Sequence, residues 1–446
     1  MTTPKTPRPP ATYQFPPDNG YYTYDLTRPE MRRVFNDQRE QFPLRASFQI
    51  SPFLVGWGAY KMVGEKAKEA GIKHAFMTTT GLKSTGIIDE ICSVLKQSGV
   101  AVTVYDKVTS NPKDVEAYDA LEAFQAAGCD GVVSVGGGTS HDIGKAVRIL
   151  ASLKKAGDSR KLRDFCMMIN PPPVGRAPLP DTSWIPQICV NTTTGTGAQF
   201  VNGGPITDTE WQYKMIFIYP GNIYLGIDDP LLHRTQPPHI LAACGIDSIV
   251  HALEGLVSRL TNPFTIGTGL AGIKLMADNL REAVGNPQND KALENCVWAQ
   301  IICTHSYCNG AGVGMIHGLA HQISAMGPGS AHHGLTNAIF MVSVCRYNLT
   351  ANPERLKDVG LAMGMDHLKH LTPVKAAELA IDELEKLRNE CGLTDVSLKQ
   401  FDWFMKDPDG YIDHAVDWAY EDYCREGNPR QVTKADIARL YREQIF

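Results

Sequence analysis

The spacing of apolar residues changes once along this chain, and that change limits the folds open to it. Up to about residue 235, short apolar runs such as HAFMTTT, VAVTVYDKV and CDGVVSV alternate with amphipathic stretches that end at glycine. Strands rich in β-branched residues that alternate with helices predict a parallel sheet covered by helices. Beyond about residue 240 the strand signals nearly vanish, and long helical patterns such as GIDSIVHALEGLVSRL take their place. We therefore predict an α/β domain with a Rossmann-like parallel sheet, followed by an all-α domain.

The length of the chain supports two domains. It has 446 residues, whereas single hydrophobic cores stop growing at roughly 250–300 residues. We expect an N-terminal arm at 1–45, an α/β dinucleotide-binding domain at 46–237 and a helical metal-binding and catalytic domain at 238–446, with the boundary at the helix-breaking QPPH. The arm is rich in proline and aromatic residues, and we expect it to pack on its own body or on a neighbouring subunit.

Composition excludes several classes of function. A net charge of −5, with 43% hydrophobic and 20% charged residues, offers no general attraction to nucleic acid or to anionic membranes. The eleven cysteines are scattered and form no CxxC pair, which is typical of a reduced protein. The proline-rich start lacks the apolar stretch of a secretory signal, and no run of eighteen apolar residues occurs. We therefore expect a cytoplasmic protein with no nucleic-acid or membrane partner.

Two loops that follow predicted strands carry residue types that bind phosphate. In VVSVGGGTSHD a strand runs into Gly136, Gly137 and Gly138, and a helix is expected to begin at Thr139 or Ser140. Glycines let the backbone approach a ligand, and the unpaired N–H groups of a helix N-terminus attract an anion. Each loop alone is equally consistent with a capped turn, but the carboxyl ends of parallel strands share one edge, so the pair predicts a nucleotide crevice. The second loop, VNTTTGTGAQF, supplies Thr192, Thr193, Thr194 and Thr196.

Four of the thirteen histidines lie within IHGLAHQISAMGPGSAHHGL, and two of them are four residues apart, which places both on one face of a helix. An aspartate and a histidine repeat this spacing upstream, in GIDSIVHALE. Two such helices can present their side chains to one another across a bundle core, and the double histidine of SAHHGL can add a further ligand. The candidate ligands are Asp247, His251, His317, His321, His332 and His333.

This donor set indicates a particular chemistry. One carboxylate and up to three imidazoles suit a borderline divalent cation such as Fe²⁺, Zn²⁺, Mn²⁺ or Co²⁺, and disfavour calcium. A cation beside a bound nicotinamide lowers the pKa of an alcohol hydroxyl and stabilises the alkoxide, which favours hydride donation. Crevice and cluster together predict a dehydrogenase with its site where the two domains meet. We expect structural roles for the other histidines: His74, His141, His233, His239, His305, His367, His370 and His414.

Several motifs, in the same order, resemble the iron-dependent (group III, metal-containing) alcohol dehydrogenases over most of the chain from about residue 52 onward. GGGTSHD is similar to the family's GGGSxxD, TTTGTG to its TTxGTG, and IDDPLL to the strand before its interdomain linker. GIDSIVHALE, HGLAHQISAM with HHGLTNAI, and GNPRQVT also match. The resemblance implies reversible oxidation of a primary or other small alcohol to its aldehyde, with NAD(P) and one divalent metal, Fe²⁺, Zn²⁺ or Mn²⁺.

The resemblance also implies roles for individual residues. The catalytic candidate His321 would lie beside the nicotinamide and the substrate rather than on the metal, and His332 would be an extra. The implied metal ligands are Asp247, His251, His317 and His333. The implied cofactor-binding residues are Thr79, Gly137, Gly138, Ser140, Asp142, Thr193, Thr194 and Thr196, with Lys214 reaching the ribose or a phosphate.

Three departures from the family pattern bear on the cofactor and the metal. Many NAD-preferring members carry an aspartate after the second strand that repels a 2′-phosphate, whereas this chain has Thr79, so NADP becomes acceptable. Gln199 replaces the glutamate of GTGSE and removes a charge near the phosphate loop. The interval from His321 to His333 is two residues longer than in the family.

The uncharged TTGL stretch, SNPKD at 110–114 and the double histidine are most similar to the methanol dehydrogenase subgroup of that family. Members of this subgroup keep the nicotinamide cofactor tightly bound, use an artificial acceptor and form large rings. The similarity therefore implies a tightly bound NADP that is recycled in place, and a homo-oligomer that can be a large ring.

Other functions remain open at this point. The same fold serves glycerol dehydrogenase-like and other polyol oxidoreductases, and also dehydroquinate-synthase-like lyases, although few arginines lie near the histidines to hold an acidic substrate. A non-catalytic nucleotide-binding assembly protein, in which the metal merely clamps two helices, is the alternative from another class. Structural zinc sites favour cysteine, however, and Cys244, Cys303 and Cys308 are not spaced with the histidines as a closed four-ligand set.

Overall fold

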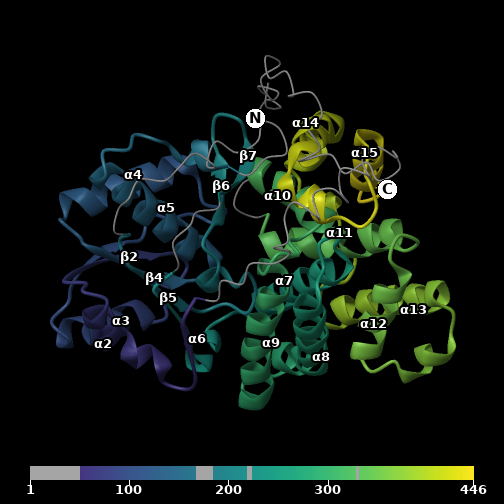
Figure 1. Cartoon of the computed structure of the whole chain (residues 1–446), viewed down its shortest axis with the longest axis horizontal. Helices are drawn as coiled ribbons and strands as arrows, with labels where there is room; N and C mark the ends of the chain where they lie inside the picture. Colours follow the sequence, from purple (N-terminus) through teal and green to yellow (C-terminus); the bar gives the residue numbers. More distant parts are fainter. Residues whose placement is uncertain (1–50, 167–183, 218–222, 328–330, 446) are drawn as a thin grey trace, which may run out of the picture.

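The computed structural model describes residues 51–166, 184–217, 223–327 and 331–445, and the expected arm at 1–45 lies outside this part of the chain. Figure 1 shows two halves side by side, one built on the strands and the other on the helices from α7 onward. The last strand ends at Asp228 and the first long helix of the second half begins at Pro238. The predicted α/β half and mostly helical half are both present.

Six strands form one parallel sheet in the order β1-β8-β5-β4-β2-β3. The two central strands β4 and β5 are buried along their whole length, as expected of parallel strands covered on both faces. Gly136 at the end of β4 pairs with Asn191 of β5, which pairs with Asp228 of β8, so these strands end along one edge. The bounds are β1 Phe53–Val55, β2 His74–Thr79, β3 Ala101–Tyr105, β4 Gly131–Gly136, β5 Gln187–Asn191 and β8 Leu225–Asp228.

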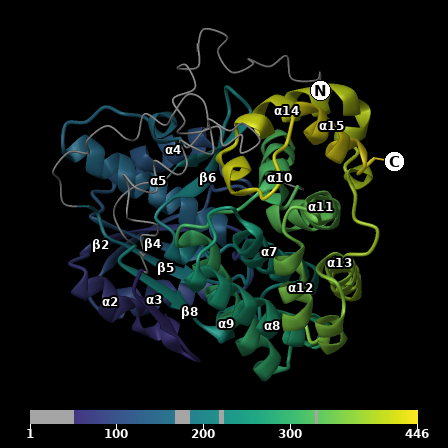
Figure 2. The same ribbon diagram turned by 45° about the vertical axis from the view of Figure 1, so that its right-hand side comes forward.

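Helices cover both faces of the sheet (Figures 1 and 2). Alternate residues of a strand point to opposite faces. Ala75 and Met77 of β2 accordingly join one apolar cluster with α2 and α3, and Phe76 between them joins another with α4 and α5. These helices are α2 Val63–Glu69, α3 Ile87–Gln97, α4 Asp114–Ala126 and α5 Gly138–Lys155.

The second half is a set of packed helices. Proline stands in the first turn of five of them, where its missing N–H leaves no hydrogen bond unmade. The helices of this half are α7 Pro238–Val257, α8 Pro263–Gly285, α9 Asp290–Cys308, α10 Met315–Met326, α11 His333–Asn348, α12 Pro353–Ala362, α13 Pro373–Glu390, α14 Pro408–Glu421 and α15 Lys434–Arg442. The short helix α6 Pro230–His233 lies before them in the chain, between β8 and α7. Short 3-10 helices are η1 Ala59–Met62, η2 Leu162–Phe165, η4 Ala198–Phe200, η5 Asp366–His370, η6 Leu398–Gln400, η7 Phe404–Lys406 and η8 Tyr423–Gly427.

Helix α7 runs through the core of this half. Every residue from Leu241 to Val257 is buried. Among the described helices it alone is long and apolar enough to cross a membrane, and 94% of its apolar window is buried inside the fold. We interpret α7 as a core helix on which the neighbouring helices pack.

A two-stranded antiparallel hairpin, which the sequence pattern did not predict, lies between the two halves (Figure 1). It consists of β6 Gly204–Asp208 and β7 Tyr213–Phe217. Tyr213 stacks on Trp418 of α14 with ring centroids 4.5 Å apart, so the hairpin ties the sheet half to the C-terminal helices. The connecting TEWQ carries none of the Asn-Gly or Asp-Gly signals that identify a hairpin from sequence.

A glycine at the contact between α7 and α11 provides a test of this packing. A Cβ on Gly334 would lie 2.5 Å from the backbone carbonyl oxygen of Ala243, which cannot move without shifting α7. Gly334→Ala should therefore lower the free energy of unfolding by about 1–3 kcal/mol. The matched control is Gly267→Ala on the exposed side of α8, where a Cβ meets nothing within 4 Å. It should raise stability by about 0.5–1 kcal/mol. Urea unfolding followed by circular dichroism measures both, and equal effects would contradict the packing described.

Candidate functional site

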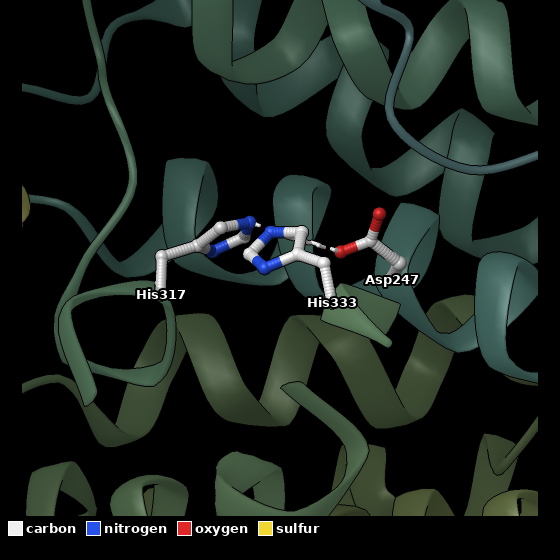
Figure 3. A group of neighbouring side chains, drawn as sticks. All are labelled: Asp247, His317 and His333. Carbon is white, nitrogen blue, oxygen red and sulfur yellow. Dashed lines mark ion pairs between the residues drawn. The ribbon is translucent and has the colours of Figure 1, made fainter. Parts of the chain in front are cut away.

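Three potential metal ligands converge where α7, α10 and α11 meet (Figure 3). Asp247 Oδ1 lies 3.8 Å from His317 Nε2 and 3.9 Å from His333 Nε2. One ligand atom from each residue lies within 4.8 Å of the others. The structure thus brings together three of the four predicted ligands, of which the first and the last are 86 residues apart in the sequence.

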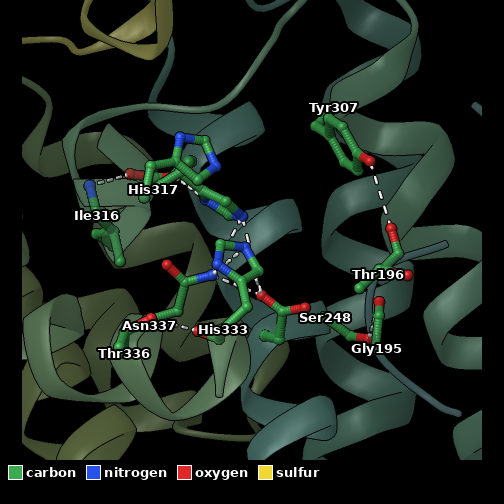
Figure 4. A network of polar contacts seen from close by, with 12 residues as sticks. Gly195, Thr196, Ser248, Tyr307, Ile316, His317, His333, Thr336 and Asn337 are labelled. Atoms are coloured by element: carbon green, nitrogen blue, oxygen red, sulfur yellow. Dashed lines mark hydrogen bonds and ion pairs between the residues drawn. The ribbon is translucent and has the colours of Figure 1, made fainter. Parts of the chain in front are cut away.

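Hydrogen bonds around this cluster leave acceptor atoms pointing at its centre. His317 Nδ1 lies 2.6 Å from Glu254 Oε2, and Glu254 Oε1 also accepts from the Ile316 amide at 2.6 Å. His317 Nδ1–H therefore donates to the carboxylate, which leaves the Nε2 lone pair free to face the cluster. Asn337 Nδ2 donates to Asp247 Oδ1 at 2.6 Å and lies 3.2 and 3.3 Å from the Nε2 atoms of His317 and His333 (Figure 4).

The fourth predicted ligand, His251, lies beside this group without joining it. Its ring packs between those of Tyr307 and His317, with both centroid distances 4.5 Å. Burial lowers the pKa of His251 to about 3, so the ring is neutral, as a metal ligand must be. Its Nδ1 is buried and has no hydrogen-bond partner among the described residues. The His251 ring therefore lies next to the His317 ligand, but its nitrogen atoms are not part of the group of ligand atoms.

The residues present fit a divalent metal. A carboxylate oxygen and two imidazole nitrogens meet around one point, and the only donor that reaches all three in the described part of the chain is the Asn337 amide. Burial also lowers the pKa of His333 well below its ordinary value, which keeps this ring neutral. Burial opposes the shift, but the hydrogen bond to Glu254 and the charge of Asp247 raise the pKa of His317, so this group of side chains attracts positive charge. The donor types favour Fe²⁺, Zn²⁺ or Mn²⁺.

The catalytic candidate His321 lies next to the cluster and outside it. Its ring stacks on that of His333, with centroids 5.3 Å apart and planes inclined by 13°. Its Nδ1 is 3.0 Å from Asp422 Oδ2, so it turns away from the metal ligands. His332 directly precedes α11 as its N-cap residue and is not part of the ligand group. The lengthened interval between His321 and His333 includes residues 328–330, which lie outside the described residues.

The two predicted phosphate-binding loops face each other. Helix α5 begins at Gly138, one residue before the expected start, with Gly137 as its N-cap. A Cβ on Gly137 would lie 2.9 Å from the Thr193 side chain, and one on Gly138 would lie 2.9 Å from the Thr196 side chain. Only glycine permits this approach, so the two loops pack closely against each other at the carboxyl ends of β4 and β5, where the sequence predicts the nucleotide crevice.

The other predicted cofactor residues are buried and differ in their hydrogen-bond partners. The hydroxyls of Thr79 and Ser140 are buried with no hydrogen-bond partner among the described residues. Thr194 is buried, and its hydroxyl contacts Gln236 at 3.4 Å. Asp142 is also buried, where its Oδ1 accepts from Lys145 at 3.0 Å, which places it in a buried ion pair rather than at an exposed surface of the crevice.

The hairpin strand β7 contributes Lys214. This side chain is buried and donates to Asn111 Oδ1 at 3.2 Å. Burial lowers the pKa of Lys214 to about 8, while the charge of Asp142 opposes the shift. A lysine held this way is still mostly protonated at neutral pH, but it gives up its proton more readily than an exposed lysine does.

The metal cluster and the crevice are linked through α7 (Figure 4). Ser248, the residue after Asp247, donates to the carbonyl oxygens of Thr194 and Gly195 at 2.8 and 3.0 Å. Tyr307 of α9 donates to the Thr196 carbonyl oxygen at 3.4 Å. The threonine loop is therefore fixed to the helix that carries the carboxylate ligand.

Sequence reasoning missed three residues of the site. Glu254 stands seven residues after Asp247 and three after His251, a spacing that places all three on one side of α7 and could have been recognised. Asn337 follows His333 by one helical turn, in HGLTN, and could have been found in the same way. Asp422 is 101 residues from His321, and no sequence spacing connects them.

Comparisons with known proteins show which family this chain is similar to. The family model described as iron-containing alcohol dehydrogenase matches residues 51–227, and the model described as Fe-containing alcohol dehydrogenase family, C-terminal, matches residues 241–445. Methanol:N,N-dimethyl-4-nitrosoaniline oxidoreductase of Mycobacterium sp. is 35% identical over 413 residues, which cover 88% of this chain and 94% of that protein. NAD-dependent methanol dehydrogenase of Bacillus methanolicus is 29% identical over 406 residues, which cover 90% of this chain and 100% of that protein. The crystal structure of a 1,3-propanediol oxidoreductase superposes with a TM-score of 0.77 at 30% identity and covers 90% of this chain and 99% of that one.

The contact between Glu254 and His317 predicts how metal affinity depends on a residue that is not itself a ligand. Glu254→Gln should weaken the binding of a divalent metal by about 10- to 100-fold, because an amide no longer holds the Nδ1 proton of His317 as a carboxylate does. Competition with a chromophoric chelator measures the affinity. Glu294→Gln, at a partly exposed position on α9, is the control and should leave it unchanged. Unaltered affinity in Glu254→Gln would show that this hydrogen bond does not orient the ligand.

Proposed function

The chain belongs to the iron-containing alcohol dehydrogenase family, and we propose that it reversibly oxidises a small primary alcohol to the aldehyde by hydride transfer to NAD(P). The observation that carries this proposal is the convergence of acceptor atoms from Asp247, His317 and His333 on one point. The hydrogen bonds of Ser248 attach that point to the crevice. A cation site fixed beside a nucleotide crevice is what alcohol oxidation by hydride transfer requires.

We assign the metal to Asp247, His251, His317 and His333, with Fe²⁺, Zn²⁺ or Mn²⁺ as the ion. When bound, such an ion polarises the substrate oxygen and stabilises the alkoxide. Glu254 keeps the His317 ring in the orientation that presents Nε2. The buried position of these side chains excludes water from around the substrate oxygen.

The crevice residues are assigned to the cofactor. Gly137 and Gly138 allow the pyrophosphate to approach the backbone at the N-terminus of α5, where unpaired N–H groups favour an anion. Thr193 and Thr196, which face these glycines, offer hydroxyls along the same crevice. The roles proposed for the remaining residues are contacts with the cofactor beyond the pyrophosphate: Thr79, Ser140, Asp142, Thr194 and Lys214.

We further propose that the chain accepts NADP, which it holds tightly. Thr79, Lys83 and Asp106 line a small cavity of about 170 Å³ at the carboxyl end of β2. The residue at the end of β2 is uncharged, so it does not repel a 2′-phosphate. The Lys83 ammonium lies 2.8 Å from Asp106 and both side chains are largely exposed, so the lysine can exchange this partner for a phosphate.

The names of similar proteins, the resemblance to one subgroup and the cysteines support proposals about substrate, assembly and compartment. The names of similar proteins, a methanol dehydrogenase and a 1,3-propanediol oxidoreductase, support a small alcohol or diol as the substrate. Resemblance to the methanol dehydrogenase subgroup supports a homo-oligomer, with a large ring as one form. Eleven free cysteines support a reducing compartment such as the cytoplasm.

Metal removal tests the proposed function directly. Exhaustive treatment with a chelator should abolish alcohol oxidation, and Fe²⁺, Zn²⁺ or Mn²⁺ should restore it. His317→Ala should remain inactive after the same addition because it lacks one ligand. His74→Ala is the control, since His74 contacts Thr103 at the opposite end of the sheet and should behave as the original chain does. Absorbance of the reduced nicotinamide, or bleaching of a dye acceptor if the cofactor stays bound, reports the activity. Activity that survives complete chelation would refute the proposal.

The proposed cofactor preference predicts a selective effect at Lys83. Lys83→Ala should weaken NADP binding by about tenfold, the loss of one charge-assisted hydrogen bond to a phosphate, and should leave NAD binding nearly unchanged. Fluorescence titration of both cofactors measures this ratio. Lys73→Ala, an exposed lysine before the amino end of β2, should change neither affinity. A parallel loss of both affinities in Lys83→Ala would contradict a 2′-phosphate contact.

A further inference from the structure

A buried carboxylate outside the metal cluster is bonded to the catalytic candidate. Asp422 precedes the 3-10 helix η8, which follows α14, and this C-terminal segment folds back onto α10 (Figure 2). Its Oδ2 lies 3.0 Å from His321 Nδ1 and also accepts from Gln322 Nε2 at 3.2 Å. Its Oδ1 accepts from the Cys424 amide at 2.9 Å. Both oxygens are therefore fixed, and the carboxylate is fully buried.

We propose that Asp422 is a positioning residue that holds His321 in the tautomer with the proton on Nδ1, so that Nε2 accepts a hydrogen bond from the substrate hydroxyl. An ionised carboxylate has no proton to donate, so the hydrogen in the short contact belongs to Nδ1. The lone pair of the ring then lies on Nε2, on the opposite side of the imidazole from Asp422. This inference rests on the proposed function for the identity of the hydroxyl, but the tautomer itself does not depend on it.

The surroundings of His321 support orientation rather than a second metal site. The atoms of His321, Asp422 and Cys424 lie within 4.8 Å of one another, a separation that a metal could also bridge. Both oxygens of Asp422 are already engaged, however, because Oδ2 lies 3.0 Å from His321 Nδ1 and Oδ1 accepts from the Cys424 amide at 2.9 Å. The carboxylate thus holds the imidazole by a direct hydrogen bond.

The ring so fixed lies against a metal ligand. His321 stacks on His333 with planes inclined by only 13° and meets His317 edge to face, with centroids 5.9 Å apart. Stacking restricts the tilt of the ring, and the hydrogen bond to Asp422 fixes its rotation about the Cβ–Cγ bond. Two independent restraints on one imidazole place Nε2 in a single direction beside the metal position. A hydrogen bond to Nε2 would therefore orient the substrate hydroxyl, and with it the neighbouring carbon for hydride donation, when a metal is bound by His317 and His333.

The test replaces the carboxylate by its amide. Asp422→Asn keeps the size of the side chain, but its N–H group can face Nδ1 and stabilise the opposite tautomer. The turnover number should fall by about 10- to 100-fold, with the metal content and KM for the cofactor unchanged. Nitrogen NMR of protein labelled with ¹⁵N-histidine should show a protonated Nδ1 in the original chain and a protonated Nε2 in the variant. Asp422→Glu, which restores a carboxylate, should recover part of the turnover and the original tautomer.

The control is Asp413→Asn, which makes the same change at an exposed carboxylate of α14, nine residues before Asp422. Its turnover should change by less than about threefold. Loss of metal together with turnover in Asp422→Asn would make Asp422 a support of the metal site and overturn the inference. A protonated Nε2 in the original chain would overturn it as well, even if the variant failed to fold. If the original chain shows the expected tautomer but oxidises no alcohol, the proposed function fails and the positioning role stands.

Discussion

The geometry of the site depends on how one buried helix, α7, packs against the loop after β5. Asp247 and Ser248 are neighbours in sequence, and successive residues of a helix point about 100° apart. Asp247 therefore faces α10 and α11, while Ser248 faces the sheet and bonds the carbonyl oxygens of Thr194 and Gly195. A shift of α7 would displace the carboxylate ligand and the threonine loop together. The distance between the metal cluster and the crevice is thus set by one rigid element.

Buried carboxylates distinguish this region from an ordinary core. Asp247, Glu254 and Asp422 are each at most 3% exposed, and burying a charge is costly unless hydrogen bonds compensate it. Glu254 receives a backbone amide and an imidazole, and Asp422 receives an amide, an imidazole and a carboxamide. Asp247 Oδ1 receives the Asn337 carboxamide and faces two imidazole nitrogens that carry lone pairs. Asp247 is therefore the carboxylate whose burial a divalent cation would stabilise most.

Much of this arrangement could be predicted because it is local. The i, i+4 spacing of His317 and His321 indicated a helix, and glycines after a strand indicated a close approach that the contact between Gly138 and Thr196 explains. The same spacing misled in one respect: the two histidines share a helix face, yet His321 bonds Asp422 and stays out of the ligand group. Sequence spacing shows which face of a helix carries a side chain. It does not show which partner that side chain meets, because the partner can come from a distant part of the chain. The hairpin and the C-terminal segment are such elements, and neither has a periodic signal.

The contacts of Gln199 give a physical reason for a neutral residue where the family pattern has a glutamate. Its side chain is buried and donates to Asp228 through contacts of 3.0 and 3.1 Å, so it serves the end of β8 rather than adding or removing charge at the crevice. Asp228 also accepts from Asn191 at 2.7 Å and from Gln300 at 2.8 Å, and it is itself fully buried. Three neutral carboxamides satisfy one carboxylate there, while a glutamate at position 199 would place two like charges in contact. A neutral side chain at position 199 thus suits the buried carboxylate of Asp228 at the end of β8. The positive charge near the phosphate loop comes from the N-terminus of α5 and from Lys214.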